Sequence, residues 1–220
     1  MLGLYVTVPI ACFRKGFARE YLETELLPPP ATCYGFMLSL VGELDRERHV
    51  GCRVSPALLS EPEKAVVLRT VWRIKKRQAP LGHGGNRTPA QQELLTGVRL
   101  LLWLDSREES GRHPNLEVRV TEACLHPERV KRFGGLSFGE STHLVDEIRL
   151  TGDLGWQADE DSSASVFVLA ELGQLTLPVW VDHVGSQRTR YVTGELKQMR
   201  LVPPDGPDWK LMPKIEPSQS

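Results

Sequence analysis

Basic side chains gather in one window of the sequence. Between Leu68 and Gln92 the chain has no aspartate or glutamate, and the cations in this window are Arg69, Arg73, Lys75, Lys76, Arg77 and Arg87. Glycines at three nearby positions let the backbone approach a ligand closely: Gly82, Gly84 and Gly85. A cationic arm with a glycine-rich tip suits the phosphate backbone of a nucleic acid better than a single point ligand. The alternative is a solvated hairpin whose charges bind nothing.

A second stretch could bind an anion through its main chain. Residues 132–141 read Arg-Phe-Gly-Gly-Leu-Ser-Phe-Gly-Glu-Ser, and we call them the glycine loop. Its glycines permit neighbouring N–H groups to converge on an oxyanion. The candidate ligands are therefore Gly134, Gly135 and Gly139, flanked by the donors Arg132, Ser141 and His143. The competing interpretation is that the glycines serve only tight packing.

The run Pro28-Pro29-Pro30 predicts an abrupt helix start. Proline cannot continue a helix from upstream, but it suits the first helical position. Apolar residues then recur at i, i+3, i+4 and i+7, the spacing of one helix face: Tyr34, Met37, Leu38 and Val41. Gly42 can close this helix. Free N–H groups beside Thr32 and Tyr34 would attract a phosphate or a carboxylate; a core helix with a stiff entry is the alternative.

Other site chemistries find less support. Residues 135–139 match G-x-S-x-G around Ser137, but the nucleophile elbow needs a strand before it and a helix after it, and the candidate partners Asp182 and His183 are adjacent. The P-loop motif is missing, and the histidines lack ligand spacing, so we expect neither a metal nor a cofactor. Metal-free RNA cleavage stays conceivable, with His83 beside Lys75 or Lys76, or with Tyr34, as the acting groups.

Bulk composition narrows the class of protein. The 220 residues carry a formal net charge of −1, which argues against a nucleic-acid binder that uses its whole surface but leaves local basic patches open. Four cysteines occur without C-x-x-C spacing, as expected for reduced thiols of a cytoplasmic protein: Cys12, Cys33, Cys52 and Cys124. The sequence has neither a signal-peptide pattern nor 18 consecutive apolar residues, so we expect neither secretion nor membrane spanning.

Apolar periodicity predicts an α+β fold. We expect strands at 4–10, 66–74 and 98–104, the last of them central, and a short strand at 116–120 before a helix at 121–130. Residues 45–63 read as a charged connection. With the helix after Pro30, the order strand, helix, strand, strand, helix, strand is that of the ferredoxin-like split βαβ fold, which RNA-recognition modules share. We expect one domain at 1–150 with an insertion at about 75–96, a small β-rich part at 151–202 and a mobile proline-rich tail at 203–220.

Several of these motifs together resemble one known family. Residues 13–20, 27–35 and 38–43 look like the N-terminal signature of the CRISPR-associated Cas5 family, in its DevS (type I-B, MYXAN-like) subtype. Residues 133–147 resemble the glycine loop of that subtype, and residues 177–183 are also similar to it. The resemblance spans most of residues 2–202. One departure is Cys33, where a valine or isoleucine is expected.

The resemblance implies a role that the residues alone do not name. Members have a ferredoxin-like domain of the RAMP superfamily with a protruding β-hairpin thumb, which the insertion at 75–96 fits. They cap the five-prime handle of the guide RNA in type I Cascade complexes of antiviral defence, next to backbone and large subunits and the target DNA. This subtype implies no catalysis, although one branch of the family cleaves the guide precursor. The predicted RNA-binding residues are Arg14, Lys15, Arg19, Thr32, Tyr34, Arg73, Lys75, Lys76, Arg77, Arg87, Arg132, Gly134, Gly135, Gly139, Ser141 and His143.

Overall fold

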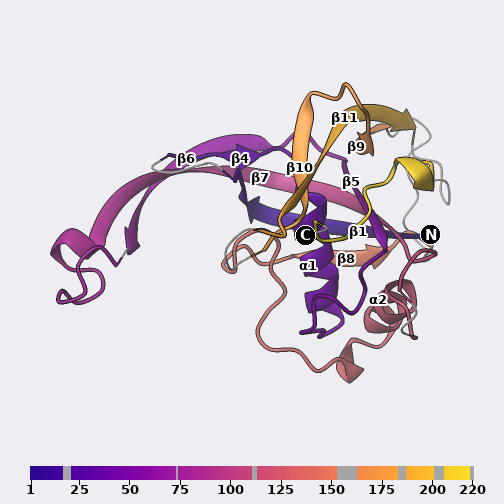
Figure 1. Ribbon diagram of the computed structural model, residues 1–220, viewed down its shortest axis with the longest axis horizontal. Coiled ribbons are helices and arrows are strands. Elements are labelled where there is room, and N and C mark those ends of the chain that lie inside the picture. Colours follow the sequence, from indigo (N-terminus) through magenta and orange to yellow (C-terminus); the bar gives the residue numbers. More distant parts are fainter. Residues whose placement is uncertain are drawn as a thin grey trace.

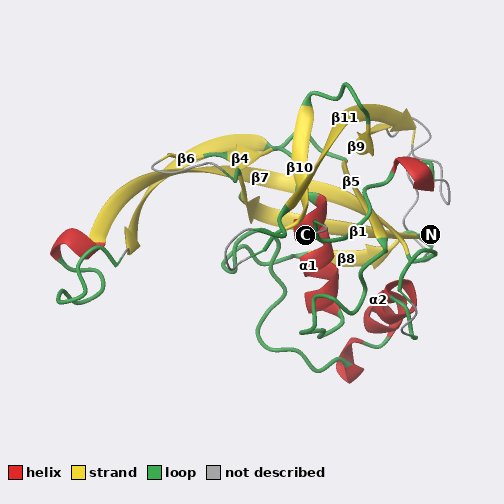
Figure 2. Ribbon diagram, viewed as in Figure 1, coloured by secondary structure: helices red, strands yellow, loops and turns green. Residues whose placement is uncertain are grey.

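One large sheet organises the molecule (Figures 1 and 2). The computed structural model describes residues 1–16, 21–72, 74–110, 113–152, 163–182, 187–200 and 206–218. Within these ranges nine strands join the sheet, along the order β10-β11-β9-β5-β7-β1-β8, with β3 and β6 also paired to β7. Strands β2 and β4 pair separately. The strands are β1 (Leu2–Ala11), β2 (Phe13–Arg14), β3 (Tyr21–Leu22), β4 (Thr24–Glu25), β5 (Arg53–Leu58), β6 (Glu63–Trp72), β7 (Arg87–Asp105), β8 (Glu147–Leu150), β9 (Ser163–Leu169), β10 (Leu175–Trp180) and β11 (Arg190–Arg200).

Strand β7 is the longest element and lies at the centre. Its second half is antiparallel to β1, from Leu2 opposite Leu104 to Ala11 opposite Leu95, and to β5 on its other side. Residues 100–105 are buried throughout, because both faces of the sheet are covered here. The near-continuous apolar run at 98–104 therefore predicted a central strand correctly.

Two α-helices cover one face of the sheet, α1 (Pro30–Leu40) and α2 (Leu116–Leu125). Their buried side chains pack in one core with Leu4 and Val6 of β1 and Leu102 of β7. The described residues also form three short 3₁₀ helices: η1 (Gly84–Asn86), η2 (Pro127–Arg129) and η3 (Trp209–Leu211). The large sheet and the two α-helices confirm the expected mixed class of the fold, although β5 takes the place that was predicted for residues 66–74.

Helix α1 starts and ends as the sequence predicts. Pro30 occupies the first turn, and Pro29 accepts hydrogen bonds at its carbonyl from the N–H groups of Thr32 and Cys33. Gly42 follows the helix with φ +67°, and a Cβ there would come within 2.2 Å of the Lys131 carbonyl oxygen. Only glycine fits this close approach in a left-handed conformation.

The expected strand at 66–74 was assigned to the wrong role. Strand β6 does exist, but it is exposed along almost its whole length and pairs only with the first half of β7, Glu63 opposite Thr96. The neighbour of β7 in the core is β5, inside the segment interpreted as a connection. Pro56 lies in the middle of β5, and proline argues against a central strand. It is tolerated because β9 pairs with β5 only at Ala57 and Leu58.

The expected strand at 116–120 is wrong, because these residues begin α2. Leu116, Val120 and Ala123 are the buried side chains of this helix, at i, i+4 and i+7. The side chain of Asn115 caps the helix by accepting a hydrogen bond from the N–H of Val118 at 3.0 Å. Val118 itself is exposed, so its alternation with the two buried residues only imitated a strand.

The C-terminal region differs from the expectation of a mobile tail. Strands β9, β10 and β11 extend the same sheet, which β9 joins through β5. Within residues 206–218, Met212 and Ile215 are fully buried, and Ile215 exchanges backbone hydrogen bonds with Gly51 and Cys52. These described residues therefore pack on the body, because two apolar anchors outweigh the proline content. All four cysteines are free thiols. No helix within the described part of the chain is long and apolar enough to cross a membrane.

Candidate nucleic-acid interface

A β-hairpin projects from the body, and we call its residues 63–96 the thumb (Figure 1). It consists of β6 and the first half of β7, so its inner strand continues directly into the core of the sheet. The thumb is thus longer than the insertion predicted at 75–96, because both of its strands belong to the hairpin. Arg87 is exposed at the start of β7, while Arg73 lies outside the described residues.

One buried amide organises the tip of the thumb. Asn86 is 1% exposed, and its Oδ1 accepts hydrogen bonds from the N–H groups of Lys75 and Lys76, both at 2.8 Å. Its Nδ2 donates to the carbonyls of Lys76 at 2.9 Å and of Ala79 at 2.7 Å. The basic run therefore turns around Asn86 and presents Lys75, Lys76 and Arg77 to solvent. Asn86 was not among the residues predicted from the sequence, because an uncharged side chain in a basic segment gives no signal there. Its role is visible only from its hydrogen bonds.

The tip is apolar as well as basic. Trp72, Ile74 and Leu81 are all exposed there. A Cβ at Gly82 would lie 3.0 Å from the Trp72 ring, so the chain passes close over that indole. Clustered apolar side chains on a protruding hairpin are typical of a surface that a partner covers.

The glycine loop is anchored in the core at one end. Phe138 is fully buried and stacks on Phe36 with a ring-centroid distance of 4.6 Å. Gly139 has φ +100°, and a Cβ there would lie 2.6 Å from the Cys12 carbonyl oxygen. The packing interpretation therefore holds at Gly139. Gly134 has φ +77°, but a Cβ there would have open space around it.

The main-chain donors of the glycine loop divide in the same way. The N–H of Phe138 donates to the carbonyl of His143, just after the loop, at 2.9 Å, and the N–H of His143 donates back to the Glu140 carbonyl at 3.0 Å. Among the described residues, no hydrogen bond uses the N–H groups of Gly134 or Gly135. A bound anion would therefore meet the exposed part of the loop, next to Arg132.

Two of the predicted RNA-binding residues have structural contacts in the core. His143 is buried, and its Nδ1 accepts a hydrogen bond from the N–H of Cys12 at 3.2 Å. Burial lowers the pKa of His143, which favours the neutral ring. Tyr34 is also buried, and its hydroxyl donates to the Arg46 carbonyl at 2.7 Å. Burial raises the pKa of Tyr34. Both side chains are buried behind the site, so the structure gives no support to the prediction that they bind RNA.

A groove runs along the exposed side of α1, and we call it the α1 groove. Its first hollow, about 350 Å³, lies between Thr32 and the glycine-loop residues 137–139. Its second hollow, about 680 Å³, lies between the end of α1 and residues 131–133. Gly35, Ser39 and Arg46 line both hollows. Two features that the sequence offered separately, the helix start and the glycine loop, thus face one surface.

Arg46 is a cation of this groove that sequence reasoning missed. Its Nη2 donates to the Val181 carbonyl at 2.7 Å, and its guanidinium lies 4.7 Å from the centre of the Trp180 ring. These contacts fix the side chain at the point where the two hollows meet. In the sequence Arg46 stands between acidic residues, so no charge pattern distinguishes it.

The strands of the thumb are tied to the glycine loop. Arg69 of β6 donates from Nη1 to Glu140 Oε2 at 2.8 Å, and Gln92 of β7 donates from Nε2 to Glu140 Oε1 at 3.0 Å. The same Arg69 Nη1 also donates to Gln92 Oε1. The three side chains form one network, which we call the thumb clamp. It joins the cationic hairpin to the wall of the α1 groove.

The other predicted residues are more dispersed. Arg14 is exposed on β2, and Lys15 Nζ lies 4.0 Å from Glu23. Arg19 lies outside the described residues, whereas Arg132 and Ser141 are exposed in the glycine loop.

The hydrolase arrangement does not assemble. Ser137 forms an isolated β-bridge with Leu144 rather than an elbow between a strand and a helix, and His183 lies outside the described residues. Of the nuclease candidates, His83 lies in the thumb tip with Lys75 and Lys76, whereas Tyr34 is buried in the core. No group of three potential metal ligands occurs in the ranges that the structure covers.

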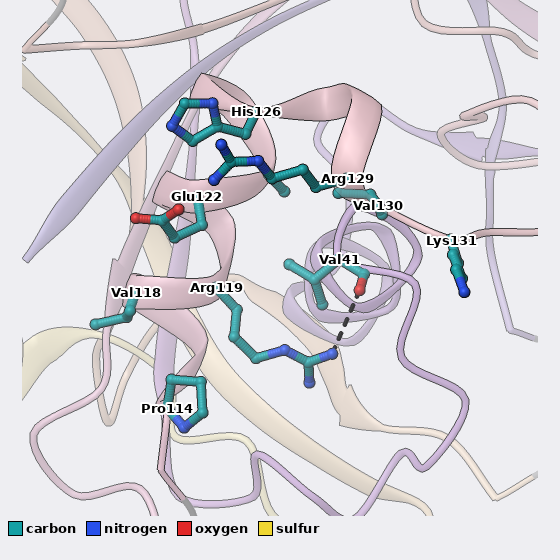
Figure 3. A pocket seen from close by; sticks show the side chains of 10 residues that line it. Val41, Pro114, Val118, Arg119, Glu122, His126, Arg129, Val130 and Lys131 are labelled. Carbon is teal, nitrogen blue, oxygen red and sulfur yellow. Dashed lines mark hydrogen bonds between the residues drawn. The ribbon is translucent and has the colours of Figure 1, made fainter.

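A separate hollow of about 420 Å³ lies between α2 and the end of α1 (Figure 3). Arg119 reaches across it and donates from Nη2 to the Val41 carbonyl at 3.3 Å. Arg119 also donates to Glu43 at 2.5 Å. Arg119 thus already joins α2 to the segment after α1. We therefore do not assign this hollow to the interface.

Comparison with known proteins identifies the family. A protein of Myxococcus xanthus (strain DK1622) named CRISPR-associated protein Cas5 is 50% identical over 203 residues, which cover 92% of this chain and 93% of that protein. The chain belongs to the Cas5 family. The family resemblance seen in the sequence is thereby confirmed, while the DevS subtype stays a prediction. No protein-family model matches the chain.

Solved structures agree with the Cas5 assignment at the level of the fold. A chain of a "CRISPR RNA-guided surveillance complex" has a TM-score of 0.59 at 12% identity, with 90% of this chain and 89% of that chain covered. A "Crystal structure of Cas protein" has a TM-score of 0.50 at 12% identity, with 97% of both chains covered. This Cas5 chain therefore has the fold of known Cas proteins along almost its full length.

Proposed function

We propose that the chain is a non-catalytic subunit of a type I Cascade complex that binds and caps the five-prime handle of the guide RNA. In this role it nucleates assembly with backbone and large subunits for recognition of target DNA. Membership of the Cas5 family supports the proposal, as does the likeness of the fold to a chain of an RNA-guided surveillance complex.

The strand order supports assignment to the ferredoxin-like fold of the RAMP superfamily. Strands β5, β7, β1 and β8 are neighbours in that order, and all their pairings are antiparallel. In chain order these strands are β1, β5, β7 and β8, and a helix follows the first and the third of them: α1 comes after β1, and α2 comes after β7. This arrangement of two βαβ units is the split βαβ pattern.

The observation that carries the proposal is the thumb clamp between Arg69, Gln92 and Glu140. It makes the thumb and the α1 groove parts of one surface, with exposed cations at both ends. A single RNA strand that crosses this surface would meet Lys75 and Lys76 on the thumb and Arg132 at the groove. Phosphate contacts of this kind position a nucleic acid without reading its sequence.

A binding assay with purified chain and labelled guide RNA tests the proposal. We expect stoichiometric binding that is lost when the handle is removed from the guide. If four to six phosphates are contacted, log affinity falls with log salt at a slope of roughly −3 to −4 for a single strand. Equal binding of guides with and without the handle would contradict handle capping.

The same reaction mixture tests the absence of catalysis. Precursor RNA incubated with the chain and a metal chelator should remain intact. A product band at the repeat boundary would instead establish a metal-independent endoribonuclease.

A further inference from the structure

Two large apolar side chains stand almost free in the same hollow. Phe133 is 102% exposed and Leu44 is 93% exposed, and both line the second hollow of the α1 groove. A single exposed apolar residue needs no explanation. Two such residues from separate segments, facing one hollow, indicate a site that a ligand covers.

The charges around this hollow favour an anionic ligand. Lys131 and Arg132 precede Phe133, and neither has an ion-pair partner among the described residues. Arg46 stands on the other side, held by the Trp180 ring. The acid of the lining, Glu43, already accepts hydrogen bonds from two arginines and from the backbone, so it is neutralised locally.

The floor of the hollow is open at Gly35 and has room for a planar group. Gly35 and Ser39 provide the helix face there, and a Cβ at Gly35 would find no heavy atom within 4 Å. The volume of about 680 Å³ is of the size that holds small ligands in proteins. A nucleotide, with one planar face and one charged end, matches both the floor and the rim.

We propose that this hollow binds one unstacked nucleobase of single-stranded RNA, with the base against the ring of Phe133 and its phosphate near Lys131 and Arg132. The inference rests on the proposed function, from which it takes the guide RNA as the source of that base. Proteins bind single-stranded RNA by stacking splayed bases on aromatic side chains inside cationic grooves. A protein partner is disfavoured because the free charges of the rim have one sign.

The test compares Phe133→Ala with Phe133→Trp in the full chain, using guide RNA and a generic single-stranded oligonucleotide as probes. Phe133→Ala removes the base–aromatic stack, so its affinity for the guide RNA should be about 5- to 150-fold lower than that of the wild type. Phe133→Trp should keep near wild-type affinity. Leu172→Ala is the matched control, because Leu172 is 97% exposed and lies between β9 and β10, and it should bind as wild type. Thermal unfolding confirms that each variant is folded.

A scan of abasic positions in the RNA completes the test. One abasic position should weaken binding to the wild-type chain but cause no further loss with Phe133→Ala, because both changes remove the same stack. Wild-type affinity of Phe133→Ala, or additive losses, would overturn the inference and leave the proposed function standing. If Phe133→Ala instead lost a protein subunit of the complex while RNA binding was retained, the hollow would be a protein-docking surface, and this result would also overturn the inference. Stacking of the generic oligonucleotide without any preference for the handle would instead contradict the proposed function alone.

Discussion

The guanidinium of Arg69 lies 2.8 Å from the carboxylate of Glu140. The first residue belongs to the outgoing strand of the thumb and the second to the glycine loop, 71 positions later in the chain. Gln92, from the returning strand, bonds to both side chains. A rotation of the thumb about its base must therefore move the glycine loop or break this clamp.

Breaking the clamp should weaken RNA binding more than it weakens the fold. Both side chains of the ion pair are partly exposed, so Arg69→Ala should lower the free energy of unfolding by no more than about 1 kcal/mol. Guide affinity should fall roughly 2- to 30-fold, because thumb and loop no longer hold one relative position. The exchange Arg69→Glu with Glu140→Arg should restore much of the affinity.

The matched control for the clamp is Arg149→Ala, which removes an ion pair with Glu147 on the edge strand β8. Affinities of Arg69→Ala and Arg149→Ala that are the same would show that the clamp has no special role.

Asn86 should determine the order of the thumb tip. Asn86→Ala removes the partners of two N–H groups and two carbonyls, a local cost of about 1–3 kcal/mol. Trypsin should then cut faster at Lys75, Lys76 and Arg77, while the thermal midpoint of the body stays nearly unchanged. His83→Ala, an exposed change in the same tip, serves as the control. Identical digestion of the two variants would refute this role.

The two glycines of the loop should respond differently to alanine. Gly134→Ala meets only the strain of its positive φ, about 1 kcal/mol. Gly139→Ala also places a methyl group 2.6 Å from the Cys12 carbonyl, which adds about 1–3 kcal/mol. The thermal unfolding midpoint of Gly139→Ala should therefore be clearly lower than that of Gly134→Ala. The reverse order would mean that the loop does not pack on Cys12 as described.

Acidification should loosen the glycine loop through His143. Burial lowers the pKa of His143 below its ordinary value of 6.5, with Glu140 opposing and Arg69 reinforcing the shift. The unfolded chain therefore binds a proton more readily than the folded one. The free energy of unfolding should fall as the pH drops below about 6.5. His143→Asn, which keeps an acceptor for the Cys12 N–H, should show a shallower decline. Parallel stability curves for the two proteins would contradict this assignment.

Local features of the sequence predicted the local structure well. The prolines before α1 and the apolar run of β7 act through near neighbours, and both predictions were confirmed as elements. The role of β6 was not predictable in this way. Its period of two is the same for a strand on a core and for an exposed hairpin, and only the partner strand distinguishes them.

Contacts between distant segments account for the remaining differences. β5 was not predicted because it contains Pro56. The C-terminal residues were expected to be mobile because of their prolines, but Met212 and Ile215 are buried against the body. Likewise, Arg46 and the glycine loop line one hollow although they lie far apart in the sequence. The sequence contains these residues, but their juxtaposition depends on tertiary packing.

Cross-linking tests the central claim most directly. A guide RNA with photoreactive uridines placed one at a time in its handle is bound to the chain, irradiated and mapped by mass spectrometry. We predict that adducts fall in two groups of peptides, residues 74–87 of the thumb and residues 131–139 of the glycine loop. Adducts confined to other surfaces, with both groups unmodified, would contradict the account.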